Sequence, residues 1–148
     1  MSEQPKDVDG EWPVLADDCL VYRAVLKRRH IDKNSNQILS GAFLRRPPGE
    51  DGTPKDVNGL SVMLAEQWPV SKICSRFNLH AVCSLSVAQI RTVPDVDPRL
   101  DVVQQTLHDY ETGHANITGL PAYGEDAIKA DNLAVELSIR CRPEYFKP

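Results

Sequence analysis

Residues 19–26, Cys-Leu-Val-Tyr-Arg-Ala-Val-Leu, open the part of this chain that decides its fold class. The stretch is rich in β-branched and aromatic side chains, and it lies between the acidic pair at 17–18 and the basic run at 27–30. Such a composition, bounded by charged residues, is typical of a strand that is buried on both faces. The segment therefore predicts the first strand of a sheet.

Further extended segments follow along the chain, separated by turn-forming residues. The region 47–54 concentrates proline and glycine, so it predicts an exposed loop. Gly41 is expected to mark a bulge in the second strand. The predicted strands after the first are 37–44, 60–64, a single long strand over 79–93, 100–103 and 115–120.

Two segments have helical periodicity. Apolar residues recur at intervals of three and four from Glu125 to Arg142, with acidic residues at the start and Pro143 after the end. A shorter helix is predicted from Pro69 to about Phe77, because proline is favoured in the first turn.

The order of these elements predicts an α+β fold. Strands run consecutively instead of alternating with helices, which favours a mixed or antiparallel sheet of about six strands with two main helices, the last one C-terminal. The sequence has no internal repeat and no second core, so residues 12–148 are expected to form a single domain. Residues 1–11 are expected to be a flexible acidic leader, followed by Trp12 packed on the domain.

The charge is unevenly distributed over the 148 residues. The net charge is −4, and the first 18 residues contain six acidic side chains against one lysine. Basic residues gather instead at Lys27–His30 and at Arg45–Arg46, and these two clusters predict a basic face that can meet phosphates or an acidic partner, of which a partner protein is the leading hypothesis. Nucleic acid is an unlikely partner, because the chain is acidic overall and has no aromatic residue beside either cluster.

Nothing in the sequence predicts a secreted or membrane protein. No window reaches the length of an apolar membrane span, and the N-terminus lacks the basic and apolar regions of a signal peptide. The expected compartment is the cytoplasm. The cysteines agree with this location, because they are scattered without a Cys-x-x-Cys pair and are expected to be buried thiols: Cys19, Cys74, Cys83 and Cys141.

The residues from His108 to His114 form the densest group of potential catalytic side chains. Two histidines and two carboxylates, including Glu111, are ligand types for zinc or iron, but the spacing is not that of a metal site and no metal is predicted. A polar loop is the simpler interpretation. His114 can also act as a general base, because its ordinary pKa suits proton transfer near neutral pH. The standard hydrolase, NTPase and dinucleotide signatures are absent.

Several short segments resemble a family of small uncharacterised bacterial proteins. The resemblance covers about residues 19–120 and implies a shared fold without a function. Its segments are Tyr22-Arg23, Ala42-Phe43 followed by the Pro/Gly loop, Gly59-Leu-Ser-Val62 and His114-Ala-Asn-Ile-Thr-Gly119.

Arg23 and Ser61 carry a second resemblance, to ADP-ribosyltransferases. In that family a first-strand arginine holds the NAD phosphates and a serine on a following strand supports the nicotinamide ribose. Ser61 stands in Leu-Ser-Val instead of Ser-Thr-Ser, and no Glu-x-Glu occurs, so the family's glutamate has only Asp101 or Glu111 as candidates. The structural alternatives are an ion pair of Arg23 with residue 17 or 18 and an ordinary strand hydroxyl at Ser61.

The sequence thus supports two hypotheses about function. The first is a protein-interaction or accessory module that uses the acidic leader and the basic face, without a cofactor. The alternative is a small NAD-dependent ADP-ribosyltransferase-like enzyme whose catalytic residues are Arg23, Ser61, His114 and Glu111.

Overall fold

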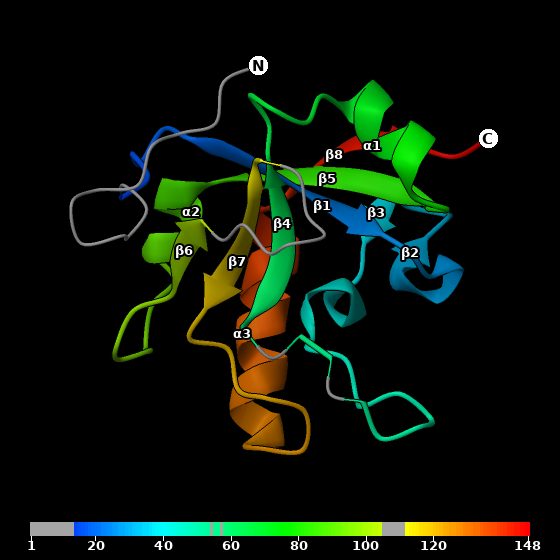
Figure 1. The fold of residues 1–148 in the computed structure, drawn as a ribbon. Coiled ribbons are helices and arrows are strands. Elements are labelled where there is room, and N and C mark those ends of the chain that lie inside the picture. The colour runs from blue at the N-terminus through cyan, green and yellow to red at the C-terminus, as the bar shows by residue number, and fades with distance from the viewer. Residues whose placement is uncertain (1–13, 54, 57, 105–111) are drawn as a thin grey trace.

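The computed structural model describes residues 14–53, 55–56, 58–104 and 112–148 (Figure 1). The predicted leader, Trp12, His108 and Glu111 lie outside the described residues. Six strands form the main sheet: β1 (Leu20–Val25), β4 (Leu60–Leu64), β5 (Ala81–Ser86), β6 (Asp101–Gln104), β7 (His114–Thr118) and β8 (Arg142–Phe146).

The order of the strands across the main sheet is β6-β7-β4-β1-β5-β8, and every neighbouring pair is antiparallel. A second, two-stranded sheet consists of β2 (Ile31–Asp32) and β3 (Gln37–Ile38). With three helices, this arrangement confirms the predicted α+β fold with an antiparallel sheet and a C-terminal helix.

The two halves of the main sheet are joined by a short contact. β1 pairs with β5 over the whole of β1, but it pairs with β4 only at Val21–Leu64 and Tyr22–Met63. Beyond Tyr22 the two strands separate, and Figure 1 shows β1, β5 and β8 running across the direction of β4, β6 and β7. The sheet therefore opens at the centre, next to Arg23.

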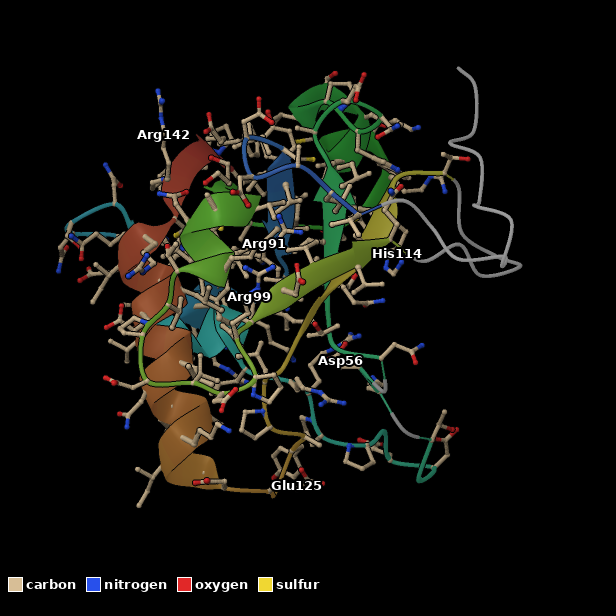
Figure 2. All side chains as sticks on the ribbon, turned by 90° about the vertical axis from the view of Figure 1, so that its left-hand side faces the viewer. Asp56, Arg91, Arg99, His114, Glu125 and Arg142 are labelled. Carbon is tan, nitrogen blue, oxygen red and sulfur yellow. The ribbon has the colours of Figure 1, made fainter. Side chains whose placement is uncertain are left out.

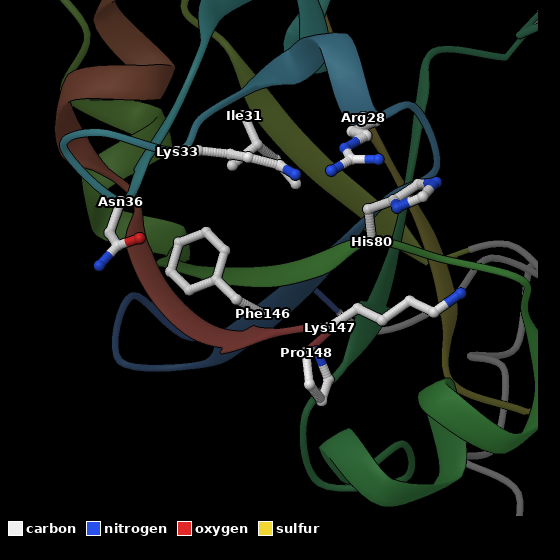
Figure 3. Close-up of a pocket in the computed structure, with 8 residues that line it drawn as sticks. All are labelled: Arg28, Ile31, Lys33, Asn36, His80, Phe146, Lys147 and Pro148. Atoms are coloured by element: carbon white, nitrogen blue, oxygen red, sulfur yellow. The ribbon is translucent and has the colours of Figure 1, made fainter.

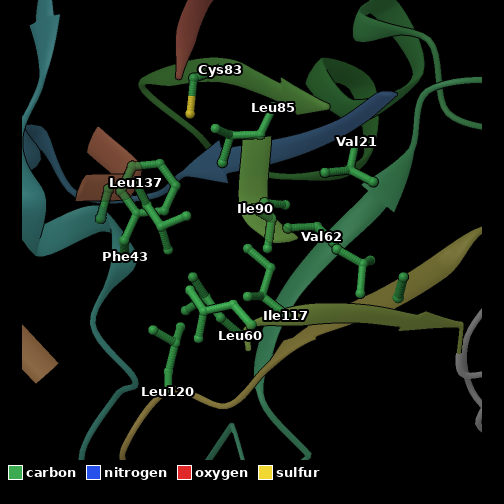
Figure 4. Packing of buried hydrophobic residues seen from close by; sticks show 14 of the residues in the cluster. Val21, Phe43, Leu60, Val62, Cys83, Leu85, Ile90, Ile117, Leu120 and Leu137 are labelled. Carbon is green, nitrogen blue, oxygen red and sulfur yellow. The ribbon is translucent and has the colours of Figure 1, made fainter. Parts of the chain in front are cut away.

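Both faces of the sheet are covered, but unequally. The main core lies between the sheet and three elements: α3 (Ala127–Arg140), the short 3-10 helix η2 (Ser40–Phe43) and α2 (Val87–Arg91). It includes fully buried side chains from each layer, such as Phe43, Leu60 and Leu137 (Figure 4). The opposite face carries a smaller apolar cluster beneath α1 (Val70–Arg76), so it is less completely covered.

The prediction of one long strand over 79–93 is wrong, because the chain forms β5 and then α2. Ser86 ends the strand and caps the helix. Its hydroxyl accepts a hydrogen bond from the Gln89 N–H at 3.1 Å, and the Gln89 side chain accepts one from the Ser86 N–H at 2.9 Å. This reciprocal capping box outweighs the strand propensity of the valine and isoleucine residues that follow.

The prediction of a strand over 37–44 is correct only for β3. The chain then turns into η2, where Ala42 and Phe43 are buried in the main core. Gly41 lies in η2 and not in a bulge. A Cβ atom at Gly41 would lie 2.7 Å from the His30 ring, so the glycine allows η2 to approach the neighbouring 3-10 helix η1 (Arg28–His30).

The C-terminal helix was predicted nearly to its ends, but the strand after it was not. Asp126 caps α3 by accepting a hydrogen bond from the Lys129 N–H at 3.1 Å. β8 then pairs along β5 at the edge of the sheet. Pro143, taken as a stop signal, is compatible with an edge strand because the outer side of such a strand needs no N–H donor. Of the four free cysteines only Cys83 is fully buried, so the prediction of four buried thiols is wrong for the other three.

Gly59 and Gly52 provide a test of why a glycine is needed directly before β4. Gly59 has φ +126°, and a Cβ there would collide with the Ile117 carbonyl oxygen of β7. We expect Gly59→Ala to lower the free energy of unfolding by about 3 kcal/mol, through both backbone strain and the collision. Gly52 also has a positive φ, +81°, but lies in open space, so Gly52→Ala should cost only about 1 kcal/mol. Equal losses in urea unfolding would contradict this explanation.

Candidate functional site

Arg23, Ser61 and His114 lie on three adjacent strands. Arg23 is in β1, Ser61 in β4 and His114 at the start of β7, and these strands are neighbours in the sheet order. Residues that are far apart in the sequence are therefore neighbours at the centre of the sheet, but the Arg23 side chain points to the main-core face, where it meets η2, and the Ser61 and His114 side chains point to the opposite face. Glu111, the fourth predicted site residue, is outside the described part of the chain.

A hydrogen bond joins Ser61 to His114. The distance between Ser61 Oγ and His114 Nε2 is 2.8 Å. The register pairs Ser61 with Asn116 and Met63 with His114, so both side chains stand on the less covered face of the sheet. His114 is only 7% exposed, while Ser61 is half-buried. A serine hydroxyl within hydrogen-bond distance of an imidazole is the geometry in which histidine can remove a proton.

The turn before β7 fixes the position of His114. Gly113 has φ +102°, and a Cβ there would lie 2.8 Å from Cδ1 of Trp68. The Trp68 indole N–H donates to the Thr112 carbonyl at 3.1 Å, and the Leu64 N–H donates to the Gly113 carbonyl at 2.7 Å. The indole ring and the end of β4 thus each hydrogen-bond the turn. These bonds to the Thr112 and Gly113 carbonyls fix the backbone from which the His114 side chain extends. Figure 2 shows His114 at the start of β7.

Arg23 bridges the opening between β1 and β4. Its Nε donates to the Ala42 carbonyl at 3.0 Å and its Nη1 donates to the Ser61 carbonyl at 2.8 Å. The guanidinium thereby replaces the ladder hydrogen bond that β1 no longer supplies, and it also ties η2 to β4. No hydrogen bond of Nη2 is found among the described residues, and the residue as a whole is half-buried.

Burial lowers the pKa of Arg23, and Asp56 opposes this shift through its negative charge. The group stays positively charged at neutral pH, because the ordinary pKa of arginine lies far above that range. The structural alternative for Arg23, an ion pair with residue 17 or 18, is not found in the described part of the chain. Asp17 bonds Arg91 instead, at 2.7 Å, and Arg91 also bonds Asp101 at 2.8 Å. Asp101 is thus engaged by an arginine outside this site.

Asp56 holds the second predicted basic cluster in place. Arg46 forms an ion pair with the Asp56 carboxylate at 3.0 Å. Arg45 donates to the Asp56 carbonyl through Nε at 3.0 Å and Nη2 at 2.6 Å, and to the Leu120 carbonyl through Nη1 at 3.0 Å. Arg45 and Arg46 therefore anchor the segment after the Pro/Gly loop, whereas the exposed side chains of Lys27, Arg28 and Arg29 have no such contact in the described part of the chain.

Gln67 is a candidate site residue that the sequence did not indicate. It is 7% exposed, and its Oε1 atom is enclosed without a hydrogen-bond partner. Its Cβ lies close to Gly113, directly before His114. An orphan acceptor at this position can receive a hydrogen bond from a ligand amide or a water molecule. No pattern in the sequence distinguishes this glutamine from an ordinary polar residue.

The described residues contain no group of three or more histidine, cysteine or acidic side chains that could hold a metal ion. In the same part of the chain, no helix has both the length and the apolar character needed to cross a membrane. The site is therefore defined by an arginine, a serine–histidine pair and an enclosed glutamine, set on an antiparallel α+β scaffold.

Comparisons with known proteins add no family to this description. No protein-family model, curated protein or solved structure matches the chain.

The Arg46–Asp56 pair predicts a pH-dependent contribution to stability. Burial would raise the pKa of Asp56, but hydrogen bonds and the charge of Arg46 outweigh it and lower the pKa overall. A carboxyl whose pKa is lower in the folded state stabilises the fold above its unfolded pKa, about 3.9, and loses this contribution as the pH falls through the folded pKa.

We expect Asp56→Asn to lower the free energy of unfolding by about 1 kcal/mol at pH 7, because Arg46 is 46% exposed and water screens the pair. The difference from wild type should shrink below about pH 4. Urea unfolding at pH 7 and pH 3 measures it, with Asp131→Asn on the exposed surface of α3 as the control. A constant difference at both pH values would contradict the assignment.

Proposed function

We propose that this protein is a small NAD-using enzyme of the ADP-ribosyltransferase type. The observation that carries the proposal is the 2.8 Å hydrogen bond between Ser61 and His114, next to an arginine that bonds the Ser61 backbone. The resemblance to ADP-ribosyltransferases gives the first-strand arginine and the following serine their roles. Arg23 reaches the Ser61 carbonyl from the main-core side of the sheet, and this backbone contact supports carrying those roles over to Arg23 and Ser61.

Arg23 suits the binding of a diphosphate. Two of its nitrogens are fixed by backbone carbonyls, so the side chain is already held in one conformation before a ligand arrives. The remaining N–H groups can donate charge-assisted hydrogen bonds to phosphate oxygens. A preorganised guanidinium loses little conformational entropy on binding, which favours its role as the anchor of the NAD phosphates.

Ser61 and His114 suit the transfer step. In ADP-ribosyl transfer the bond between C1′ of the ribose and the nicotinamide nitrogen breaks, and nicotinamide leaves with the electron pair. The acceptor oxygen forms the new bond to C1′, and its proton passes to a base. We assign Ser61 to the ribose hydroxyls and His114 to the acceptor proton. Gln67 Oε1 is positioned near the same turn, where it can accept from the carboxamide of nicotinamide.

The first test measures nicotinamide release from NAD, with water as the acceptor. We expect wild type to release nicotinamide and Ser61→Ala to do so at least about tenfold more slowly, because the substitution removes the hydroxyl but keeps the backbone carbonyl that Arg23 needs. Ser84→Ala is the matched control. Ser84 lies on β5 and bonds Glu144, away from His114, so its loss should leave the rate unchanged.

Arg23→Lys tests the two roles of Arg23, in binding NAD and in supporting the fold. Lysine keeps the charge but cannot make both carbonyl hydrogen bonds, so the variant should raise KM for NAD and also lower the melting temperature. Absence of nicotinamide release by the folded wild-type protein, or equal rates in Ser61→Ala and wild type, would overturn the proposal.

The protein-interaction hypothesis remains a second proposal, supported by the exposed residues Lys27, Arg28 and Arg29, whose side chains have no ion pair within the described part of the chain. Its test is affinity capture with wild type and with a variant that lacks residues 1–11 and has neutral residues at 27–29. An unchanged set of captured partners would contradict it.

A further inference from the structure

A depression of about 430 Å³ lies apart from Arg23 and Ser61 (Figure 3). It is built where β5 begins, where β8 ends, and from η1 and the β2–β3 hairpin. Backbone hydrogen bonds hold the strand ends together. The His80 N–H donates to the Val25 carbonyl at 2.8 Å, and the Lys147 N–H donates to the His80 carbonyl at 2.9 Å. The walls therefore rest on fixed backbone.

The side chains of the lining are predominantly basic. Arg28, Lys33, His80 and Lys147 contribute side chains, and none of the lining residues is an aspartate or a glutamate. Within the described part of the chain, none of these four side chains forms an ion pair or a hydrogen bond. Arg91, in contrast, is engaged by two carboxylates. The depression thus brings together basic side chains that make no such contact within the described residues.

Two of these cations converge. Figure 3 shows the Lys33 ammonium and the Arg28 guanidinium directed toward one another, with the ring of Phe146 below them in the view. Like charges that point into the same space repel each other, and an anion between them removes the repulsion. The neighbouring His30 shows the same excess of positive charge: burial lowers its pKa, and Arg29, Arg23 and Lys27 lower it further.

The remaining lining is suited to a planar ring. Phe146 is half-buried against the main core, so its ring is held in place while one part of it faces the depression. Asn36 adds an amide that can donate or accept hydrogen bonds at the edge of such a ring. The volume lies within the range of small-molecule sites in proteins. Cations beside an aromatic ring favour a ligand that joins a phosphate to a planar base.

We propose that this depression binds a nucleoside monophosphate group, with the phosphate on Arg28 and Lys33 and the base on Phe146. The same chemistry is offered by a free nucleotide and by the 5′-phosphorylated end of a nucleic-acid strand. This site goes beyond the proposed function, because it uses neither Arg23 nor Ser61.

Isothermal titration calorimetry with AMP tests the site. We expect AMP to bind wild type, and Arg28→Ala/Lys33→Ala to weaken binding about tenfold or more, because both side chains donate to the phosphate. Lys55→Ala/Lys129→Ala removes the same charge outside the depression and should bind AMP as wild type does. Phe146→Leu should weaken AMP binding but not the binding of inorganic phosphate.

Further ligands distinguish the source of the nucleotide. A 5′-phosphorylated oligonucleotide that binds much more tightly than AMP, while its unphosphorylated form does not, would identify a strand end. Equal or weaker binding than AMP would identify the free nucleotide. Three results would overturn the proposal: no heat with AMP up to about 5 mM, equal losses in the two double variants, or tighter binding of a hexaglutamate peptide than of AMP.

The result is independent of the proposed enzyme activity. Ser61→Ala should bind AMP normally even though it releases nicotinamide slowly, and Arg28→Ala/Lys33→Ala should release nicotinamide at the wild-type rate at saturating NAD. A wild-type protein that releases nicotinamide but does not bind AMP would overturn only the nucleotide site. A wild-type protein that binds AMP but releases no nicotinamide would overturn only the transferase.

Discussion

The centre of this structure depends on one guanidinium group. β1 leaves β4 after two residue pairs, and the backbone carbonyls at the opening need a donor that the ladder does not supply. Arg23 supplies it by bonding Ser61 in β4 and Ala42 in η2. Because η2 packs on α3, the same side chain links the two halves of the sheet to the layer that covers the main core. The hydrogen bonds of Arg23 therefore connect the opening of the sheet, the main core and the candidate site.

The basic side chains fall into two groups, those that bond other parts of the chain and those that do not. Some arginines bond carbonyls and carboxylates within the chain and thereby fix loops and strand ends: Arg23, Arg45, Arg46 and Arg91. The exposed cations of η1 and the β2–β3 hairpin are not used in this way. Basic side chains that contribute to stability are thus separated in space from those that remain available to an anion. This separation is invisible in the net charge of −4.

The candidate site was only partly predictable. The resemblance to ADP-ribosyltransferases selected Arg23 and Ser61, the ordinary pKa of imidazole selected His114, and the contact between Ser61 and His114 joins two of these residues directly. The structure also assigns Arg23 a supporting role through backbone carbonyls, which the expected ion pair with an aspartate did not anticipate. Gln67 escaped prediction because its significance lies in an unpaired, enclosed oxygen, a property of packing that no residue pattern encodes.

The sequence by itself determined the elements whose signals lie within a few neighbouring residues. Enrichment in strand-forming residues indicated β1 and β4, and the spacing of apolar residues with acidic residues at the start indicated α3, because these signals act over a few residues. Tertiary structure decided the rest. Ser86 ends β5 within a strand-like run, Pro143 is accepted in β8 because the strand lies at the sheet edge, and Ser61 meets His114 across 53 positions of sequence. Strand order and register arise from the burial of whole faces against one another, so they follow from contacts between distant segments and not from any one segment.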